Sequence, residues 1–281
     1  MQQTEFNWRT GSDQLKIRGM VWQPLPGNPI RAVIALVHGM GEHLGRYRRF
    51  AEFFTSKGFA IISFDQRGHG KSDGKKGHIV HYNQLLDGID DLLEKTRLQF
   101  KDKPVILYGH SMGGNLVLNY ALKKPNSVKA VIATGPWLRL AFDPPVLQIK
   151  LAQLMRNLYP GFTQSSGLKT QYLSRDADVV RAYERDRLVH DRISASFFIN
   201  LHQAGLYALQ HANELKLPTL LMHGGGDKIT SASATEEFAG KSGLVSELKI
   251  WDGLYHEIHN EPEREEVLEF ANRWIDQQLN A

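Results

Sequence analysis

Short apolar runs alternate with longer amphipathic stretches over most of this 281-residue chain. The runs are rich in Val, Ile and Leu, which is typical of buried parallel strands, and they lie at Ala32–Val37, Phe59–Phe64, Val105–Tyr108, Val128–Ala133, Thr219–Met222 and Leu248–Trp251. Stretches with helical spacing lie between most of them or after the last, at Tyr47–Lys57, Tyr82–Phe100, Met112–Lys124, Ala232–Lys241 and Glu263–Leu279. This alternation predicts an α/β fold whose parallel strands are joined by right-handed helical crossovers.

A β-hairpin is predicted before the first parallel strand. Its strands are Asn7–Arg9 and Leu15–Trp22, and its turn lies at Thr10–Asp13. Together with the six apolar runs, the hairpin gives a mostly parallel sheet of eight strands flanked by helices.

One interval breaks the alternation of strands and helices. Between Gly135 and Leu217 the sequence is mostly helical in pattern and is interrupted by prolines and glycines. We therefore predict a helical cap at residues 137–213, inserted between two parts of one core, at 1–136 and 214–281.

Composition narrows the class of protein. The formal net charge is +4, but Lys and Arg are scattered among 30 acidic residues, so nucleic acid is not an expected partner. The chain has no cysteine, which excludes disulfides, thiolate metal sites and a cysteine nucleophile. No apolar run reaches membrane-spanning length, and the N-terminal residues lack the apolar segment of a secretory signal, so a soluble, cytoplasmic protein is expected.

The segment Gly109-His110-Ser111-Met112-Gly113 fits the pattern G-x-S-x-G. This pattern builds a tight turn from a strand into a helix and exposes the serine hydroxyl, and here a strand-like run precedes it and a helical pattern follows. The pattern is short enough to arise by chance, in which case it would be a glycine-rich turn without chemistry. Its context favours Ser111 as a nucleophile.

Other polar residues follow the predicted strands, at the sheet edge where ligands of such folds bind. Asp227 follows one strand in a glycine-rich loop, and His256 follows the last strand. We interpret Asp227 as the acid that orients a histidine and His256 as the base for Ser111; Asp143 and Asp252 are the rival acids. The chain order Ser, Asp, His is that of the α/β-hydrolase triad.

Backbone amides near the serine can stabilise a negatively charged oxygen. Met112 directly follows Ser111 and supplies one N–H group, while the glycine-rich loop His38–His43 is placed to supply another. The alternative for this loop is a glycine turn without a catalytic role. His38 and His223, each at a strand end before glycine, are expected to fix backbone turns.

A metal site is not expected. His256-Glu257-Ile258-His259 superficially resembles a zinc-binding helix, but its histidines are three residues apart instead of four. His78 and His81 have the same spacing and no acid or histidine cluster nearby. The proposed chemistry requires neither a metal nor a cofactor.

Five segments together resemble the monoacylglycerol lipase and lysophospholipase group of α/β-hydrolase serine hydrolases. They are HGMGEHLGRY (38–47), FDQRGHGKSDG (64–74), GHSMGG (109–114), HGGGDKI (223–229) and YHEIHNE (255–261). The resemblance implies the triad Ser111, Asp227 and His256, with the amides of Met40 and Met112 as oxyanion donors.

The same resemblance implies that Glu42, Arg46 and His259 border a polar pocket for the glycerol of the substrate. A carboxylate and a guanidinium would suit the two free hydroxyls of a monoester. The alternative is that Glu42 and Arg46, four residues apart, simply pair at a solvated helix start.

The predicted cap contains an amphipathic helix at Val146–Tyr159. Leu147, Leu151, Leu154 and Leu158 share one face, and Lys150, Gln153 and Arg156 lie opposite. This helix is too short to span a bilayer; it could roof an acyl-binding pocket or enter a membrane interface, and packing on the core is the simpler alternative.

The predicted function is hydrolysis of lipid monoesters, such as monoacylglycerol, to a fatty acid and glycerol through an acyl-enzyme on Ser111. The expected partner is a small lipid ester, with transient membrane contact through the cap. A lysophospholipase, a short-chain carboxylesterase and a C–C bond hydrolase are alternatives that use the same triad. A ligand receptor of hydrolase fold with little turnover is the alternative outside enzymes.

Overall fold

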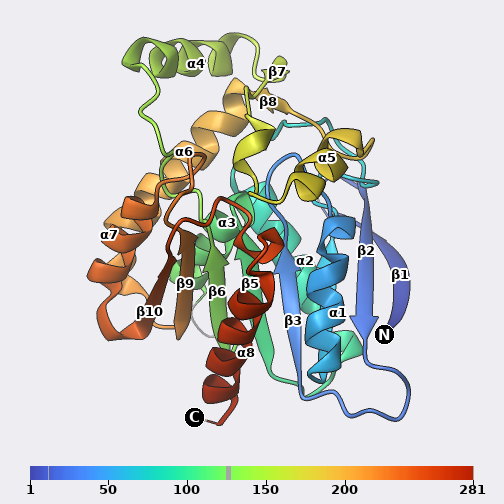
Figure 1. The fold of residues 1–281 in the computed structure, drawn as a ribbon. Coiled ribbons are helices and arrows are strands. Elements are labelled where there is room, and N and C mark those ends of the chain that lie inside the picture. Colours follow the sequence, from blue (N-terminus) through green and yellow to red (C-terminus); the bar gives the residue numbers. More distant parts are fainter. Residues whose placement is uncertain (12, 125–127, 281) are drawn as a thin grey trace.

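The computed structural model describes residues 1–11, 13–124 and 128–280 (Figure 1). Within these residues one sheet has eight strands in the order β1-β2-β4-β3-β5-β6-β9-β10. The strands are β1 (Gln2–Arg9), β2 (Lys16–Gln23), β3 (Ala32–Val37), β4 (Phe59–Phe64), β5 (Val105–His110), β6 (Ala130–Thr134), β9 (Thr219–Gly224) and β10 (Ser246–Trp251). β1 and β2 pair antiparallel, β2 also pairs antiparallel with β4, and the remaining pairs are parallel. The predicted α/β fold with a mostly parallel sheet is confirmed.

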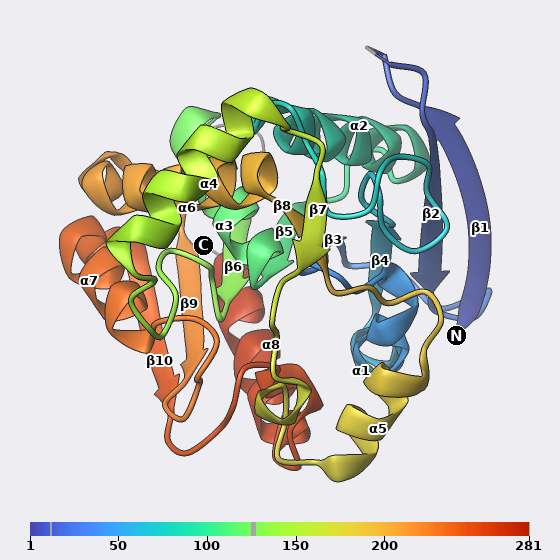
Figure 2. The ribbon, with the colours of Figure 1, turned by 90° about the horizontal axis from the view of Figure 1, so that it is seen from above.

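Helices cover both faces of this sheet (Figures 1 and 2). The flanking helices are α1 (Arg48–Ser56), α2 (Asn83–Gln99), α3 (Met112–Lys123), α7 (Ala232–Ser242) and α8 (Arg264–Asn280). Side chains of β3 alternate between two apolar clusters: Val33, Ala35 and Val37 join the cluster that includes α2, α3 and α7, whereas Ile34 and Leu36 join the cluster with α1 and α8. Because every residue of β3 is buried, the strand reads as a continuous apolar run.

Several observed strands differ from the predicted ones by one or more residues at an end, and β1 and β6 are the clearest cases. β1 begins at Gln2, five residues before the predicted strand, because its polar residues pair with β2 along the whole edge without an apolar signal. β6 covers Ala130–Thr134, shifted toward the C-terminus from the predicted Val128–Ala133. Ser12, in the predicted hairpin turn, lies outside the described residues.

The segment between β6 and β9 stands beyond the carboxyl ends of the parallel strands (Figure 1). It holds α4 (Val146–Leu158), β7 (Thr163–Ser165), α5 (Ala177–Arg185), β8 (Arg192–Ser194) and α6 (Ala195–Gln210), with short 3-10 helices at Thr170–Tyr172 and Ala212–Glu214. β7 and β8 pair antiparallel, a small sheet that the sequence pattern did not indicate. α4 packs on α6 and extends across the top of the molecule (Figure 2).

The other 3-10 helices lie at Leu44–Tyr47, Gly243–Val245 and Ile258–Asn260. Among the helices that the structure describes, none combines the length and the apolar character needed to cross a membrane.

Candidate active site

Ser111 stands in the turn between β5 and α3 with a backbone φ of 56°. A side chain is strained in this left-handed region, and such strain is common where a residue is held for function. The flanking glycines allow the turn to pack closely: a Cβ at Gly109 would lie 2.2 Å from the carbonyl oxygen of Gly113, and a Cβ at Gly113 would lie 2.0 Å from that of Val37. The strand-to-helix turn predicted from G-x-S-x-G is therefore present.

The structure brings His256 and Asp227 together from loops 29 residues apart in the chain. His256 Nδ1 lies 2.7 Å from Asp227 Oδ2. Because a carboxylate only accepts, Nδ1 carries the proton and Nε2 is left as the basic nitrogen. Burial alone would lower the pKa of His256, but the Asp227 charge and hydrogen bond outweigh it and raise the pKa above its ordinary value of 6.5.

Asp227 is held by more than one donor. Its Oδ1 accepts the backbone N–H groups of Ile229 (2.7 Å) and Thr230 (3.1 Å), and its Oδ2 accepts the Thr230 hydroxyl (2.9 Å). Burial would raise the pKa of this carboxyl, whereas the His256 charge and the hydrogen bonds hold it well below its usual range. Of the rival acids, Asp143 and Asp252 are both exposed, and neither bonds to His256.

His223 has a role at the site that the sequence reasoning missed. It was expected to fix a turn, but its Nε2 lies 3.0 Å from Asp227 Oδ2 and its Nδ1 lies 2.8 Å from the hydroxyl of Thr235. His223 therefore donates to the same carboxylate oxygen as His256. Its position at the end of β9, four residues before Asp227, is the signal that could have indicated this contact.

Two backbone amides near Ser111 have no acceptor. Met112 begins α3, so its N–H has no partner within the helix, and neither it nor the N–H of Met40 donates to any residue that the structure describes. Met40 lines the same cavity wall as Ser111. Met112 directly follows Ser111 in the chain. Free N–H groups at this place suit a developing oxyanion.

The loop that carries Met40 is held from two sides. On the core side, Gly39 N–H donates to Glu42 Oε1 (2.6 Å), and Gln66 Nε2 donates to the carbonyl of His38 (2.6 Å). On the cap side, His190 N–H donates to the carbonyl of Gly41 (2.9 Å). The loop is therefore fixed partly by the inserted segment.

Two further contacts join this region to the segment around α5. His43 Nε2 lies 2.8 Å from Asp186 Oδ2, and the guanidinium of Arg46 lies 4.7 Å from the ring centre of Tyr183. Together with the bond from His190, they form what we call the cap clamp, defined by Tyr183, Asp186 and His190.

Arg46 is the centre of a buried ion-pair network. It donates to both carboxylate oxygens of Glu257 (2.6 and 2.8 Å) and to Glu42 Oε2 (2.8 Å), and Glu42 also accepts from Tyr47 Oη (2.8 Å). The side chains of Arg46, Glu42 and Glu257 are 9%, 4% and 2% exposed. Glu42 and Arg46 thus pair, as one alternative predicted, but inside the protein instead of at a solvated helix start.

Glu257 was missed as a partner in this network. In the sequence, Glu257 stands out only within the segment His256–His259, which superficially resembles a zinc-binding helix. Its partner Arg46 is 211 residues away in the chain. Burial would raise the pKa of Glu257, but Arg46 lowers it to about 2, so the carboxylate is charged near neutrality.

The structure places only one of the three residues predicted to contact glycerol in the cavity wall. Glu42 lines the cavity, whereas Arg46 and His259 are not among the residues that line it. His259 is 2% exposed and stacks on Tyr47 with ring centres 5.1 Å apart, and it packs on His110 at 4.7 Å. Burial lowers the pKa of His259 to about 4, so this ring is neutral near pH 7. His110, on which it packs, in turn packs against His256 with ring centres 4.8 Å apart.

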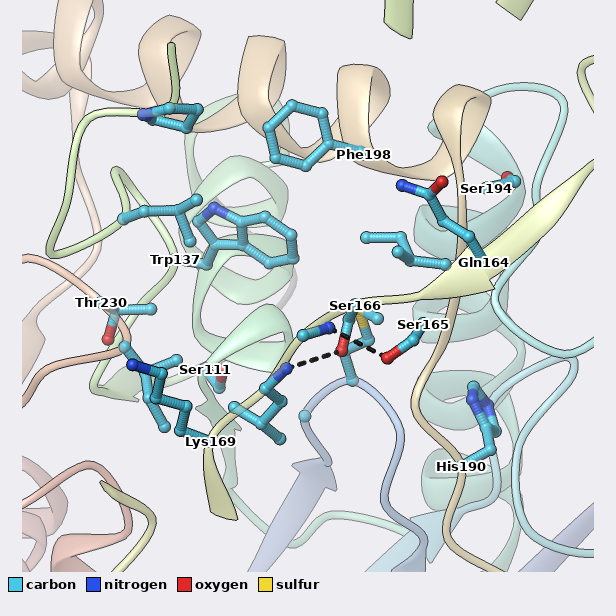
Figure 3. A pocket seen from close by; sticks show the side chains of 18 of the residues that line it. Ser111, Trp137, Gln164, Ser165, Ser166, Lys169, His190, Ser194, Phe198 and Thr230 are labelled. Atoms are coloured by element: carbon cyan, nitrogen blue, oxygen red, sulfur yellow. Dashed lines mark hydrogen bonds between the residues drawn. The ribbon is translucent and has the colours of Figure 1, made fainter. Parts of the chain in front are cut away.

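A cavity of about 990 Å³ opens between the sheet edge and the inserted segment (Figure 3). Ser111 and His256 lie in its wall together with Met40. Most of the rest of the wall is apolar, and its larger apolar side chains are Trp137, Leu140, Phe142, Ile149, Leu151, Met155, Tyr159, Phe162, Leu168, Leu173, Ile193 and Phe198. A volume of this size is at the upper end of small-molecule sites and suits a ligand with a long apolar part.

α4 lies over this cavity, but the face that lines the cavity is not the predicted leucine stripe. Ile149, Ala152 and Met155 are partly buried and line the cavity, whereas the predicted apolar stripe faces outward. The four leucines of that stripe are exposed by 77%, 55%, 54% and 59%, and they are Leu147, Leu151, Leu154 and Leu158. Of the four, Leu151 also borders the cavity. The alternative in which the stripe packs on the core is therefore wrong.

No group of three or more His, Cys, Asp or Glu side chains within residues 1–11, 13–124 and 128–280 is arranged to hold a metal ion. What the geometry brings together is a strained serine, a histidine oriented by a buried aspartate, and two unpaired amides. This arrangement is that of a serine hydrolase.

Comparison with known proteins agrees with this geometry. A family model described as serine aminopeptidase, S33 (Hydrolase_4) matches residues 28–263, and the chain belongs to this family of α/β hydrolases. An uncharacterized abhydrolase domain-containing protein of Dictyostelium discoideum is 34% identical over 95% of this chain, and this chain spans 28% of that protein's length.

Two relatives match over nearly their whole length. The monoacylglycerol lipase of Mycolicibacterium smegmatis is 33% identical over 91% of this chain and 91% of that protein. The crystal structure of Paleococcus ferrophilus monoacylglycerol lipase is 31% identical with a TM-score of 0.83, and the match covers 99% of this chain and 100% of that one. The family resemblance predicted from the five sequence segments is confirmed.

Proposed function

We propose that this serine hydrolase cleaves lipid monoesters of the monoacylglycerol type. The observation that carries the proposal is that Ser111, His256 and Met40 line one large, mostly apolar cavity, with the unpaired amide of Met112 directly after Ser111 in the chain. The names of the relatives that match along their whole length support the substrate class.

Each group has a defined task in the reaction. His256 Nε2 takes the proton of the Ser111 hydroxyl as the oxygen attacks the ester carbonyl, while Asp227 holds the ring and stabilises its positive charge. The amides of Met40 and Met112 donate to the oxyanion of the tetrahedral intermediate. The proton then passes from His256 to the leaving alcohol, and an acyl group stays on Ser111. Water activated by His256 releases the fatty acid.

The cavity favours an ester over the peptide substrate that the name of the matched family suggests. An aminopeptidase needs a carboxylate for the free ammonium group of its substrate. Within the described cavity wall the carboxylates are Glu42 and Glu257, and the oxygens of both already accept hydrogen bonds from Arg46. An apolar acyl chain, in contrast, matches the wall between Trp137 and α4.

Residues 137–213 serve as the cap in this proposal, and α4 is the part that meets the lipid surface. Its outward leucines form an apolar stripe beside the cavity, and Lys150 lies on the same helix. A helix with these properties lies in the interface plane of a membrane and does not cross it. The acyl chain would then pass from the lipid phase into the cavity.

The test is kcat/KM over a series of monoacylglycerols, lysophospholipids and short p-nitrophenyl esters, with Ser111→Ala as control. We expect long-chain monoesters, monoacylglycerols among them, to be cleaved faster than the short soluble esters and the Ser111→Ala protein to be folded but inactive. A clear preference for short soluble esters would replace the lipid function with that of a carboxylesterase. Failure of a fluorophosphonate probe to label the folded wild-type protein would favour a non-catalytic receptor.

A further inference from the structure

The cavity wall carries an unbalanced positive charge. Apart from histidines, the ionisable residues with formal charge in the described wall are Glu42, Glu257, Lys169 and Lys228. Both carboxylates are bound by Arg46, which is not among the residues that line the cavity. Arg46 offsets one of the two negative charges, and neither lysine forms an ion pair with any residue that the structure describes, so the wall and Arg46 together carry a net charge of +1.

Both lysines are gathered on one aromatic side chain. The Nζ atoms of Lys228 and Lys169 lie 5.0 Å and 6.0 Å from the ring centre of Tyr172, and Lys228 Nζ also lies 6.0 Å from the ring of Tyr255. A cation over an aromatic face is held in place by the ring while its N–H donors stay available. Lys228 directly follows Asp227 in the chain, so this pair lies at the triad side of the cavity.

The chain segment before Lys169 adds two hydroxyl donors. Ser165 Oγ accepts from Gly167 N–H (3.2 Å), and Ser166 Oγ accepts from Leu168 N–H (3.3 Å), as the dashed lines of Figure 3 show. Each hydroxyl accepts a bond and therefore has its hydrogen free to donate. Both serines line the cavity, on the side of Ser111 away from Lys169 in the view of Figure 3.

Lys169 and the aromatic side chains Trp137 and Phe198 lie in different parts of the cavity wall. In the view of Figure 3, Trp137 and Phe198 lie to one side of Ser111 and Lys169 lies to the other. A substrate whose ester carbonyl is at Ser111 would place its acyl chain against the aromatic side chains and its alcohol portion toward the lysines.

We infer that Lys169 and Lys228 form a subsite for an anionic phosphate ester on the alcohol portion of the substrate. The inference rests on the proposed function, because it assumes a lipid monoester bound at Ser111. It assigns a preference for lysophospholipids with a terminal phosphate over neutral monoacylglycerols of the same acyl length. Phosphate oxygens accept hydrogen bonds only, and ammonium groups are common phosphate ligands.

The experiment compares three octanoyl monoesters below their micelle concentrations: octanoylglycerol, octanoylglycerol 3-phosphate and octanoylglycerophosphocholine. We expect kcat/KM for the terminal phosphate to exceed that for octanoylglycerol about tenfold, the size that two solvent-exposed ion contacts can supply. The double variant Lys169→Gln/Lys228→Gln should lose this preference and cleave octanoylglycerol as before, and Lys169→Arg/Lys228→Arg should keep it.

Matched controls separate a subsite from general attraction of anions. Lys76→Gln/Lys150→Gln removes two exposed charges that do not line the cavity and should leave the preference unchanged. An equal loss in this control would overturn the subsite in favour of overall charge. Inorganic phosphate and glycerol 3-phosphate are added as inhibitors of octanoylglycerol cleavage. Inhibition by both without preferred cleavage of the phospholipid would assign the lysines to free phosphate and overturn the lipid assignment.

The two proposals fail in different ways. If octanoylglycerol is cleaved and the terminal phosphate gives no advantage, the anionic subsite is wrong and the monoester hydrolase stands. If the labelled, folded enzyme cleaves none of the three esters, the proposed function itself is wrong.

Discussion

Two regions of this protein depart from the usual distribution of residues in opposite ways. Beside the triad, Arg46, Glu42 and Glu257 place three charges in the interior. On α4, the stripe of leucines places four large apolar side chains in solvent. Charged residues are rarely buried unless they are paired, whereas single exposed apolar residues are common and exposed apolar stripes are not.

The difference lies in where each group finds its partner. The buried charges are matched within the chain, by bonds of 2.6 to 2.8 Å that also fix Gly39 and the loop of Met40 through Glu42. The leucines have no comparable cover in the described part of the chain. In the folded protein the buried charges already have bonding partners. Under the proposed function, the leucines are covered only at a lipid surface.

The largest expected effect is at the acid of the triad. Asp227→Asn should lower kcat by about 10⁴, because an amide favours the wrong imidazole tautomer, as it does in a comparable triad. The measurement is kcat on an activated ester, with circular dichroism to verify the fold. Activity close to wild type would exclude Asp227 as the orienting acid.

The buried network should contribute strongly to stability. Arg46→Met leaves two carboxylates buried without their partner and should lower the free energy of unfolding by about 3–5 kcal/mol. Arg48→Met is the matched control, since Arg48 also pairs with a glutamate four residues later but is 70% exposed. Its loss should be about 0.5 kcal/mol or less. The free energies are measured by urea unfolding. Equal losses in the two variants would show that burial does not determine how much an ion pair contributes to stability.

The leucine stripe should behave in the opposite way. Leu147→Ser/Leu154→Ser/Leu158→Ser should change the free energy of unfolding by less than about 0.5 kcal/mol per site, because these side chains are already exposed. Hydrolysis of monoacylglycerol in vesicles should fall several-fold, and hydrolysis of a soluble short ester should not change. The control is Leu244→Ser, a fully exposed leucine far from α4 in the chain. A large loss of stability would instead place the stripe in the folded core.

The smallest expected effect is on the pH profile. His256 must be neutral to act as a base, so kcat/KM should rise with pH through the pKa of His256, and the raised pKa places the midpoint above 6.5. In Asp227→Asn the midpoint should move to lower pH, because the main group that raises the pKa has lost its charge. A midpoint that does not move would mean that another group controls the profile.

The sequence predicted those parts of the site that depend on residue type at a fixed local spacing. Ser111 was singled out because its turn requires nearby glycines, and Asp227 and His256 were singled out because they follow strands of one sheet. Glu257 was missed because its role depends on Arg46, and nothing local connects two residues that far apart. For α4, the apolar periodicity correctly predicted that the leucines from Leu147 to Leu158 share one face. It did not predict what covers that face, because a repeat of apolar residues does not distinguish a protein surface from a lipid surface.

The cap clamp has a consequence for the exchange of parts between relatives. Tyr183, Asp186 and His190 contact the loop of Met40, whereas α4 packs on α6 and has no part in these bonds. A chimera that receives a foreign segment in place of residues 141–162 would retain the native support of the oxyanion amides. A graft of the whole inserted segment would also have to supply a new clamp. Substrate range can therefore diversify through α4 while the catalytic apparatus is inherited unchanged.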